Sequence, residues 1–173
     1  FLLLGLLASN AALIVHNRNL NSSIQRGELA LAEGQSMPAI TGIDADGHEQ
    51  IFDWGKDNRK TLLMIFSPRC GYCRENMPNW TAILQGIDKS EYRVVVASSV
   101  SDGAKEYIEE YKIKDVPVII EPEPKVLVGY LMHVTPQTIL LSSDGKIEKI
   151  YVGKITDEQN AYVEQALNVN LPK

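Results

Sequence analysis

Residues 61–66 (TLLMIF) form a short run that is apolar at five of its six positions, and Ser67-Pro68 interrupts it. A run of this length and composition is typical of a strand that is buried on both faces. Further on, apolar residues at positions 77, 80, 83, 84 and 87 lie about one helical turn apart, which predicts a helix over residues 71–86. A buried strand that leads directly into a helix restricts the chain to layered α/β folds.

The same alternation continues on both sides of this unit. Turn signals at Asp46-Gly47 and Asp144-Gly145 predict two hairpins, because each pair separates two strand-like runs. We expect strands at residues 39–43, 49–54, 92–97, 116–120, 138–141 and 146–152, and helices at 104–111, 125–132 and 156–167. The order predicts one α/β domain with a mixed sheet flanked by helices, since the closing antiparallel hairpin excludes a purely parallel sheet.

The start of the chain differs from the rest. Residues 1–15 (FLLLGLLASNAALIV) hold twelve apolar residues and no charge, which is shorter than the roughly 20 residues of a bilayer span. The chain opens on Phe, so we expect residues 1–17 to be a truncated N-terminal membrane helix. A cleaved signal segment and a buried core helix are the alternatives. We expect residues 18–37 to form a neck and residues 38–173 the domain, located in the periplasm or otherwise outside the cytoplasmic membrane.

Charge and cysteine content exclude several functions. The 17 Lys and Arg residues against 22 Asp and Glu give a net charge of −5, which offers no surface to neutralise phosphates. We therefore expect no nucleic-acid partner. Two cysteines are too few for a disulfide-stapled small fold or an all-cysteine zinc site.

The two cysteines, Cys70 and Cys73, lie at the start of the predicted helix over residues 71–86. Unpaired backbone N–H groups and the helix dipole favour a thiolate there, and Arg69 and Arg74 add positive charge. These features make Cys70 the candidate nucleophile of disulfide exchange and Cys73 the resolving thiol. Alternatives are two incidental core thiols or half of a metal site, whose other ligands would come from three scattered histidines, His16, His48 and His133.

The motif resembles the active-site helix of the thioredoxin superfamily, in which a proline follows the second cysteine as Pro78 does here. Residues 134–138 (VTPQT) resemble the cis-proline loop of the same superfamily. The N-terminal segment, the hairpin before the first core strand and the extra βα segment are similar to membrane-tethered TlpA/ResA-type thiol–disulfide oxidoreductases. The similarity covers about residues 35–170.

The resemblance implies a thioredoxin-like fold with an N-terminal β-hairpin extension, and catalysis by Cys70 and Cys73 without cofactor or metal. It implies exchange with cysteines of protein substrates through a mixed disulfide on Cys70, and a membrane or periplasmic electron donor. Pro136 would be cis and lie against the cysteines, leaving the Thr135 backbone free to pair with a peptide. The supporting residues are Arg69, Gly71, Tyr72, Pro78, Thr135 and Pro136.

The chain also departs from these relatives. Met64 and Asn76 occupy positions where thioredoxins and some ResA-like proteins carry a carboxylate, so no proton acceptor for Cys73 is identified. The Gly-Tyr pair between the cysteines matches some periplasmic isomerases, which leaves the redox direction open, with reduction favoured. A copper-delivery module using His133 is one alternative, although such proteins carry CxxxC. A peroxidase is another, but its Pro-x-x-x-Thr-x-x-Cys pattern would need other residues at Leu63 and Ser67.

Overall fold

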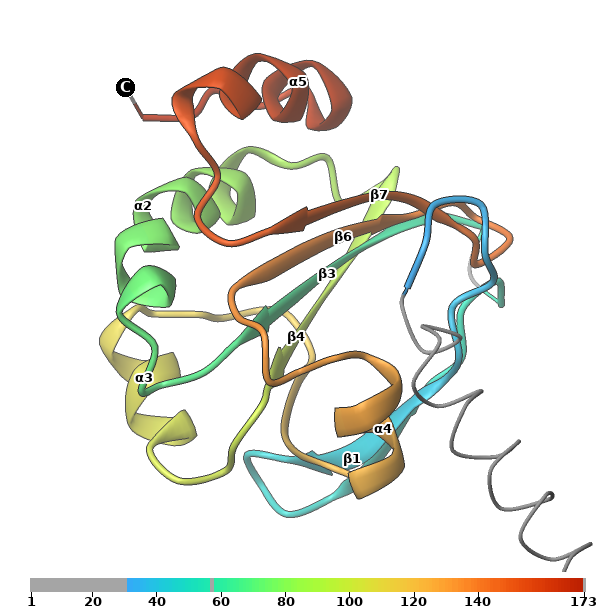
Figure 1. The fold of residues 1–173 in the computed structure, drawn as a ribbon, viewed down its shortest axis with the longest axis vertical. Coiled ribbons are helices and arrows are strands. Elements are labelled where there is room, and N and C mark those ends of the chain that lie inside the picture. Colours follow the sequence, from blue (N-terminus) through green and yellow to red (C-terminus); the bar gives the residue numbers. More distant parts are fainter. Residues whose placement is uncertain (1–30, 57, 173) are drawn as a thin grey trace, which may run out of the picture. The chain divides into compact units, whose positions relative to one another are not determined.

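A computed structural model describes residues 31–56 and 58–172 (Figure 1). The predicted N-terminal anchor or signal segment, residues 1–17, lies outside the described residues, as does most of the predicted neck. Its described end, residues 31–37, forms a turn and a single bridge between Ser36 and Lys146. Within the described ranges, no helix is both long and apolar enough to cross a membrane.

The described chain contains seven strands and four helices. In chain order they are β1 (Ile40–Asp44), β2 (Glu49–Phe52), β3 (Lys60–Phe66), α2 (Gly71–Gly86), β4 (Tyr92–Ser98), α3 (Ala104–Glu110), β5 (Val118–Pro122), α4 (Pro124–Gly129), β6 (Gln137–Leu141), β7 (Ile147–Val152) and α5 (Asp157–Leu167). The predicted order of elements is therefore confirmed. The fifth strand begins two residues later than predicted, because Asp115 has a positive φ of 59° and Pro117 follows it.

The seven strands form one mixed sheet in the order β2-β1-β5-β4-β3-β6-β7. The central strands β3, β4 and β5 run parallel, and the pairs β1–β2, β1–β5, β3–β6 and β6–β7 are antiparallel. Strand β3 is paired with β4 along its whole length and with β6 at residues 61–65, so the segment that follows it starts from a firmly held strand inside the sheet.

Alternate residues of β3 enter two separate cores, one on each face of the sheet. Leu62, Met64 and Phe66 lie in the core that contains Cys73 and buried residues of α2, α3 and α5. Leu63 and Ile65 lie in the other core, which includes Val126 of α4. Both faces are covered, and this explains why the run at residues 61–66 is continuously apolar.

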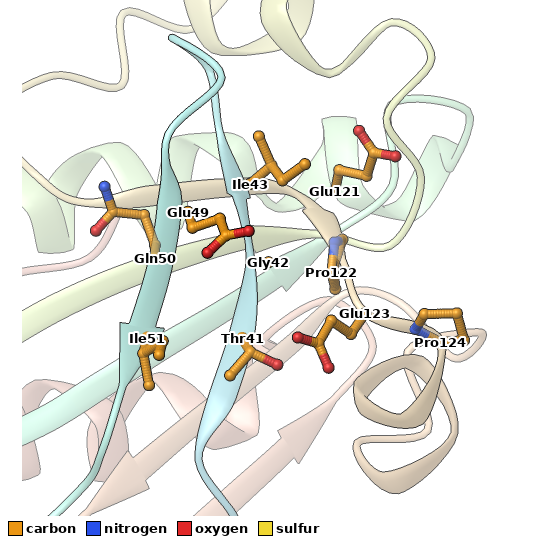
Figure 2. Close-up of a pocket in the computed structure, with 10 residues that line it drawn as sticks. All are labelled: Thr41, Gly42, Ile43, Glu49, Gln50, Ile51, Glu121, Pro122, Glu123 and Pro124. Carbon is orange, nitrogen blue, oxygen red and sulfur yellow. The ribbon is translucent and has the colours of Figure 1, made fainter.

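Strand β1 approaches β5 closely, and glycine is required at the contact. A Cβ atom on Gly42 would lie 2.6 Å from the Glu121 carbonyl oxygen, which a real side chain could not tolerate. Helix α4 begins beside this point, where the Glu123 N–H donates to the Thr41 carbonyl at 3.0 Å (Figure 1). Figure 2 shows the pocket of about 290 Å³ at this edge of the sheet, and neither cysteine lines it.

Candidate active site

Cys70 lies at the junction between β3 and α2. The strand ends at Phe66, and Cys70 is the N-cap of α2, with extended backbone angles of φ −90° and ψ 119°. Its sulfur accepts a hydrogen bond from the Cys73 N–H at 3.4 Å, one of the donors that a helix start leaves unpaired. Cys70 is partly exposed and Cys73 is completely buried, so only the first sulfur can be reached by a large substrate.

The Thr135–Pro136 peptide bond is cis, as the resemblance implied. The Cys70 thiol donates to the Thr135 carbonyl oxygen at 3.4 Å, so the loop before β6 lies directly against the helix start. Pro136 is buried and Thr135 is half-buried. The expected juxtaposition of residues 134–138 with the cysteine pair is therefore present.

The surroundings of Cys70 favour its thiolate. Partial burial opposes ionisation, but hydrogen bonds from the Thr135 and Cys73 side chains and from the Cys73 and Tyr72 N–H groups outweigh burial and lower the pKa of Cys70. The contact of the neutral thiol with the Thr135 carbonyl favours the protonated form, and the net direction is nevertheless downward. Cys70 is thus suited to attack as a thiolate.

Cys73 has the opposite character. Burial raises the pKa of its thiol to about 12, and the neighbouring Cys70 sulfur adds to the effect. The Ser67 N–H lies 3.5 Å from the Cys73 sulfur and acts in the other direction. The two thiols therefore differ in exposure and in acidity, although they are separated by only two residues.

Arg69 and Arg74 contribute less positive charge than the sequence suggested. Arg69 forms an ion pair with Asp102, and Arg74 lies 3.3 Å from Glu110. Each carboxylate offsets the charge of its guanidinium, so hydrogen bonding is the better explanation for the lowered pKa of Cys70. Arg74 also donates to the Pro68 carbonyl at 3.3 Å, which ties α2 to the loop before it.

The other predicted supporting residues lie at the surface of α2. Tyr72 exposes 65% of its surface between the two cysteines, and Gly71 is also exposed. Pro78 lies inside α2, which continues as one helix from Gly71 to Gly86. These placements leave Tyr72 available to contact a protein substrate.

Candidate metal ligands are distributed elsewhere. In the part of the chain that the structure describes, the cluster of three possible ligands is Asp44, Asp46 and His48 in the β1–β2 turn, and it contains neither cysteine. His133 is exposed, and His16 lies outside the described residues.

The sequence did not reveal which buried polar side chains bind the backbone of the segments around the site. The Asn76 side-chain oxygen accepts from the Ile155 N–H at 2.9 Å, and the Asn79 amide donates to the Ile155 carbonyl at 3.3 Å. Gln137, directly after the cis-proline, is buried and donates to three carbonyls of the preceding loop. A long polar side chain at the start of a run that ends in three apolar residues was the signal that could have revealed Gln137.

An apolar groove of about 410 Å³ lies along the loop between α4 and the cis-proline. Its lining residues come from the segment after β4, from α4 and from this loop: Ser99, Val100, Leu127, Val128, Leu131, Met132 and His133. Ser99 donates its N–H to the Phe66 carbonyl at the end of β3, and Thr135 follows two residues after His133.

This chain is similar in sequence and in fold to known thiol–disulfide oxidoreductases. The Redoxin family model matches residues 32–167. Sporulation thiol-disulfide oxidoreductase A of Bacillus subtilis is 23% identical over 58% of this chain and 64% of its own length. Thiol-disulfide oxidoreductase ResA of Geobacillus kaustophilus is 25% identical over 75% of this chain and 74% of its own. The thioredoxin domain of a thiol-disulfide oxidoreductase from Bacteroides vulgatus is 25% identical, covers 80% of this chain and all of its own, and has a TM-score of 0.65.

Proposed function

The chain belongs to the Redoxin family, and from that premise we propose that it reduces disulfides of protein substrates through Cys70. Its fold is that of a thiol–disulfide oxidoreductase of the ResA type, and its two cysteines are separated by two residues. The observation that carries the proposal is the contrast between the two thiols. Cys70 is reachable, has a lowered pKa and lies against Thr135, whereas Cys73 is buried with its pKa raised to about 12.

The proposed reaction has two exchange steps. The Cys70 thiolate attacks one sulfur of a substrate disulfide, forming a mixed disulfide and releasing the other substrate sulfur as a thiolate, which takes a proton from water. Cys73 then loses its proton and attacks the Cys70 sulfur, forming the Cys70–Cys73 disulfide and releasing the second substrate thiol. Two electrons pass to the substrate, so a dithiol donor must reduce the pair again.

The mixed disulfide also makes the second step easier. The negative charge on Cys70 and its hydrogen bond are part of what raises the pKa of Cys73. Once Cys70 is bonded to the substrate it no longer carries charge, so this contribution disappears and Cys73 ionises more readily. The two thiols then act in a fixed order.

We also propose where the domain is located in the cell. Residues 1–17 would anchor the chain in the membrane, with the domain outside the cytoplasm, where protein disulfides form and a membrane or periplasmic donor supplies electrons. Protease added to intact spheroplasts should digest the domain, and alkaline carbonate should not extract it. Protection from the protease would contradict this placement.

The central experiment separates the two cysteines. Cys70→Ser should abolish reduction of insulin disulfides, because no accessible thiolate remains. Cys73→Ser should instead accumulate a mixed disulfide with the substrate, visible as a mass adduct that dithiothreitol removes. Iodoacetamide should modify Cys70 before Cys73 in the reduced wild-type protein near neutral pH. Equal rates at both thiols, or adducts on Cys73, would overturn the assignment.

A further inference from the structure

Gln137 is the first residue of β6 and exposes only 3% of its surface. Its backbone is held on both sides, opposite Ile65 of β3 and opposite Val152 of β7. The side-chain amide therefore extends from a backbone position that neighbouring strands fix on both sides.

The Gln137 side-chain amide donates hydrogen bonds to three main-chain carbonyls of the loop that precedes it. It donates to the oxygens of Val134 at 2.8 Å, Leu131 at 3.0 Å and Tyr130 at 3.2 Å. An amide has two N–H bonds, so at least one is shared between two acceptors. Buried carbonyls that converge in this way need a donor between them, and Gln137 supplies it.

The clamped loop has an unusual local conformation. Leu131 has a positive φ of 49°, although it has a side chain, and such a conformation persists where surrounding contacts determine it. The loop also closes on itself, because the Val134 N–H donates to the Leu131 carbonyl at 2.9 Å. Gln137 thus holds both ends of this turn.

The residue that follows the clamped loop is Thr135, whose carbonyl lies 3.4 Å from the Cys70 sulfur. On the other side of the cis bond, the Pro136 carbonyl accepts from the Gly153 N–H at 2.8 Å. Gln137 is paired with Ile65, and β3 leads from Ile65 into the loop that ends at Cys70. The segment that carries Cys70 and the loop that carries Thr135 therefore both connect to the same pair of sheet residues, Ile65 and Gln137.

We propose that Gln137 is a positioning residue that holds Thr135 against Cys70, and so sets both the reactivity of the Cys70 thiol and the alignment of the substrate polypeptide on the Thr135 backbone. The first effect stands on the contact between Thr135 and Cys70 and on the hydrogen bond from the Thr135 side chain, which lowers the pKa of Cys70. The second rests on the proposed function, because it needs a polypeptide substrate.

The test uses two variants and a matched control. Gln137→Met keeps the length of the side chain but removes the donor, and Gln137→Glu places a carboxylate against the three carbonyls. Thr138→Val is the control for stability, since Thr138 is the next residue in β6, is equally buried and accepts a hydrogen bond from Trp80 at 2.8 Å rather than from the loop. Sheet pairing through the backbone is retained in all three variants.

We expect iodoacetamide to modify Cys70 about threefold to tenfold more slowly at neutral pH in Gln137→Met. Displacement of Thr135 weakens the hydrogen bond from its side chain, which lowers the pKa of Cys70, and this loss exceeds the loss of the carbonyl contact that favours the protonated thiol. The pH at which alkylation is half-maximal should rise, and Gln137→Glu should show a larger change. KM for insulin should rise more than KM for a small disulfide. Thr138→Val should lower thermal stability without moving the pH profile.

An unchanged alkylation profile in a folded Gln137→Met protein would overturn the proposal and leave Gln137 as a stabilising residue only. If Gln137→Glu does not fold, Gln137→Met alone decides the question, and Gln137→Asn, which keeps the amide but shortens its reach, should give an intermediate profile. Absence of insulin turnover in the wild-type protein would refute the proposed function, whereas the alkylation profile would still decide the role of Gln137.

Discussion

Cys70 and Cys73 have the same chemical group, and their different properties come from where α2 begins. Cys70 caps the helix and receives hydrogen bonds from its first turn, whereas Cys73 is buried in the core between the sheet and helices α2, α3 and α5. The first environment stabilises negative charge on sulfur and the second penalises it. This division depends on one turn of helix, so a motif of four residues was enough to suggest it.

The raised pKa of Cys73 makes the stability of the reduced protein depend on alkaline pH. Below about pH 9 the thiol is protonated in both the folded and the unfolded chain, so its contribution to stability is fully present. Between about pH 9 and 12 only the unfolded chain loses the proton, so the free energy of unfolding falls as pH rises. At pH 10.5 the loss attributable to Cys73 should be about 2 kcal/mol.

Urea unfolding under reducing conditions from pH 8 to 11 measures this loss, with Cys73→Ala as the reference. The variant lacks the titrating thiol but keeps the buried tyrosines, whose own pKa values are also raised by burial. The difference between the two proteins therefore reports the Cys73 thiol together with its effects on the pKa values of Cys70 and Tyr107. A difference that stays constant over this range would show that the Cys73 thiol ionises near its ordinary pKa.

Tyr72 provides a test of substrate contact at the residue scale. Tyr72→Ser should raise KM for a protein disulfide by about threefold to tenfold, because an exposed aromatic ring beside the reacting sulfur offers contact area that serine lacks. KM for a small disulfide should change little. Tyr162→Ser is the matched control, since Tyr162 on α5 exposes 70% of its surface and Tyr72 65%. Equal effects of the two variants would exclude a specific contact at Tyr72.

Local sequence patterns predicted the reactive residues better than the residues that hold them. The cysteine pair, Pro136 and Thr135 stand in short motifs, so each could be identified from its immediate neighbours in the chain. The ion pairs of Arg69 and Arg74 depend on partners far along the chain, and Gln137 depends on the irregular conformation of the loop that precedes it. Such contacts leave no repeating pattern, so only the folded chain reveals them.

At the scale of elements, the helices and strands followed from periodicity and turn residues. Helix α2 begins and ends where the spacing of its apolar residues predicted, because one continuous face packs on the sheet. The difference at the start of β5 has a local cause, since Pro117 has no N–H to donate to a neighbouring strand. The two hairpin turns followed from their Asp-Gly pairs, whereas the conformation of the longer loops was not predictable in this way.

Two asparagines of α2 tie this helix to the loop between β7 and α5. Asn79 donates to the Ile155 carbonyl and Asn76 accepts from the Ile155 N–H, so both backbone groups of one buried residue are paired by side chains. Asn79→Ala should lower the free energy of unfolding by about 1–3 kcal/mol, the cost of leaving a buried carbonyl unpaired.

Denaturant unfolding of the reduced protein measures this change. Asn170→Ala is the control, because Asn170 is exposed near the C-terminus and its replacement should alter stability by less than about 0.5 kcal/mol. A loss of similar size in both variants would show that the tie through Ile155 contributes nothing specific.

For the whole molecule, β3 is the strand that connects both cores to the cysteine site. It pairs with β4 on one side and with β6 on the other, it sends alternate side chains into two cores, and it leads into Cys70. The sequence predicted a mixed sheet, but not the order of its strands, because pairing between distant segments depends on contacts that no local pattern specifies. Cys73 lies in only one of the two cores, so a substitution in the other core can lower the stability of the protein without changing the surroundings of Cys73.

Leu63 and Phe66 lie on opposite faces of β3 and are both fully buried. Leu63→Ala should lower the free energy of unfolding by about 2–5 kcal/mol, and Phe66→Ala by about 3–5 kcal/mol, because each leaves a cavity in a core. Only Phe66 stacks on Tyr107, at 4.6 Å between ring centroids, in the core that contains Cys73, and it precedes Ser67, whose N–H lies against the Cys73 sulfur.

The two variants should therefore differ in reactivity although both lose stability. In a Cys70→Ser background, iodoacetamide should modify Cys73 faster in Phe66→Ala than in Leu63→Ala, because the cavity beneath Cys73 admits water and reagent and lowers the cost of the thiolate. Measuring both rates at temperatures where the two proteins have equal free energies of unfolding removes the contribution of global opening. Equal rates under these conditions would mean that the core beneath Cys73 does not control its reactivity, and that the two faces of the sheet act as one.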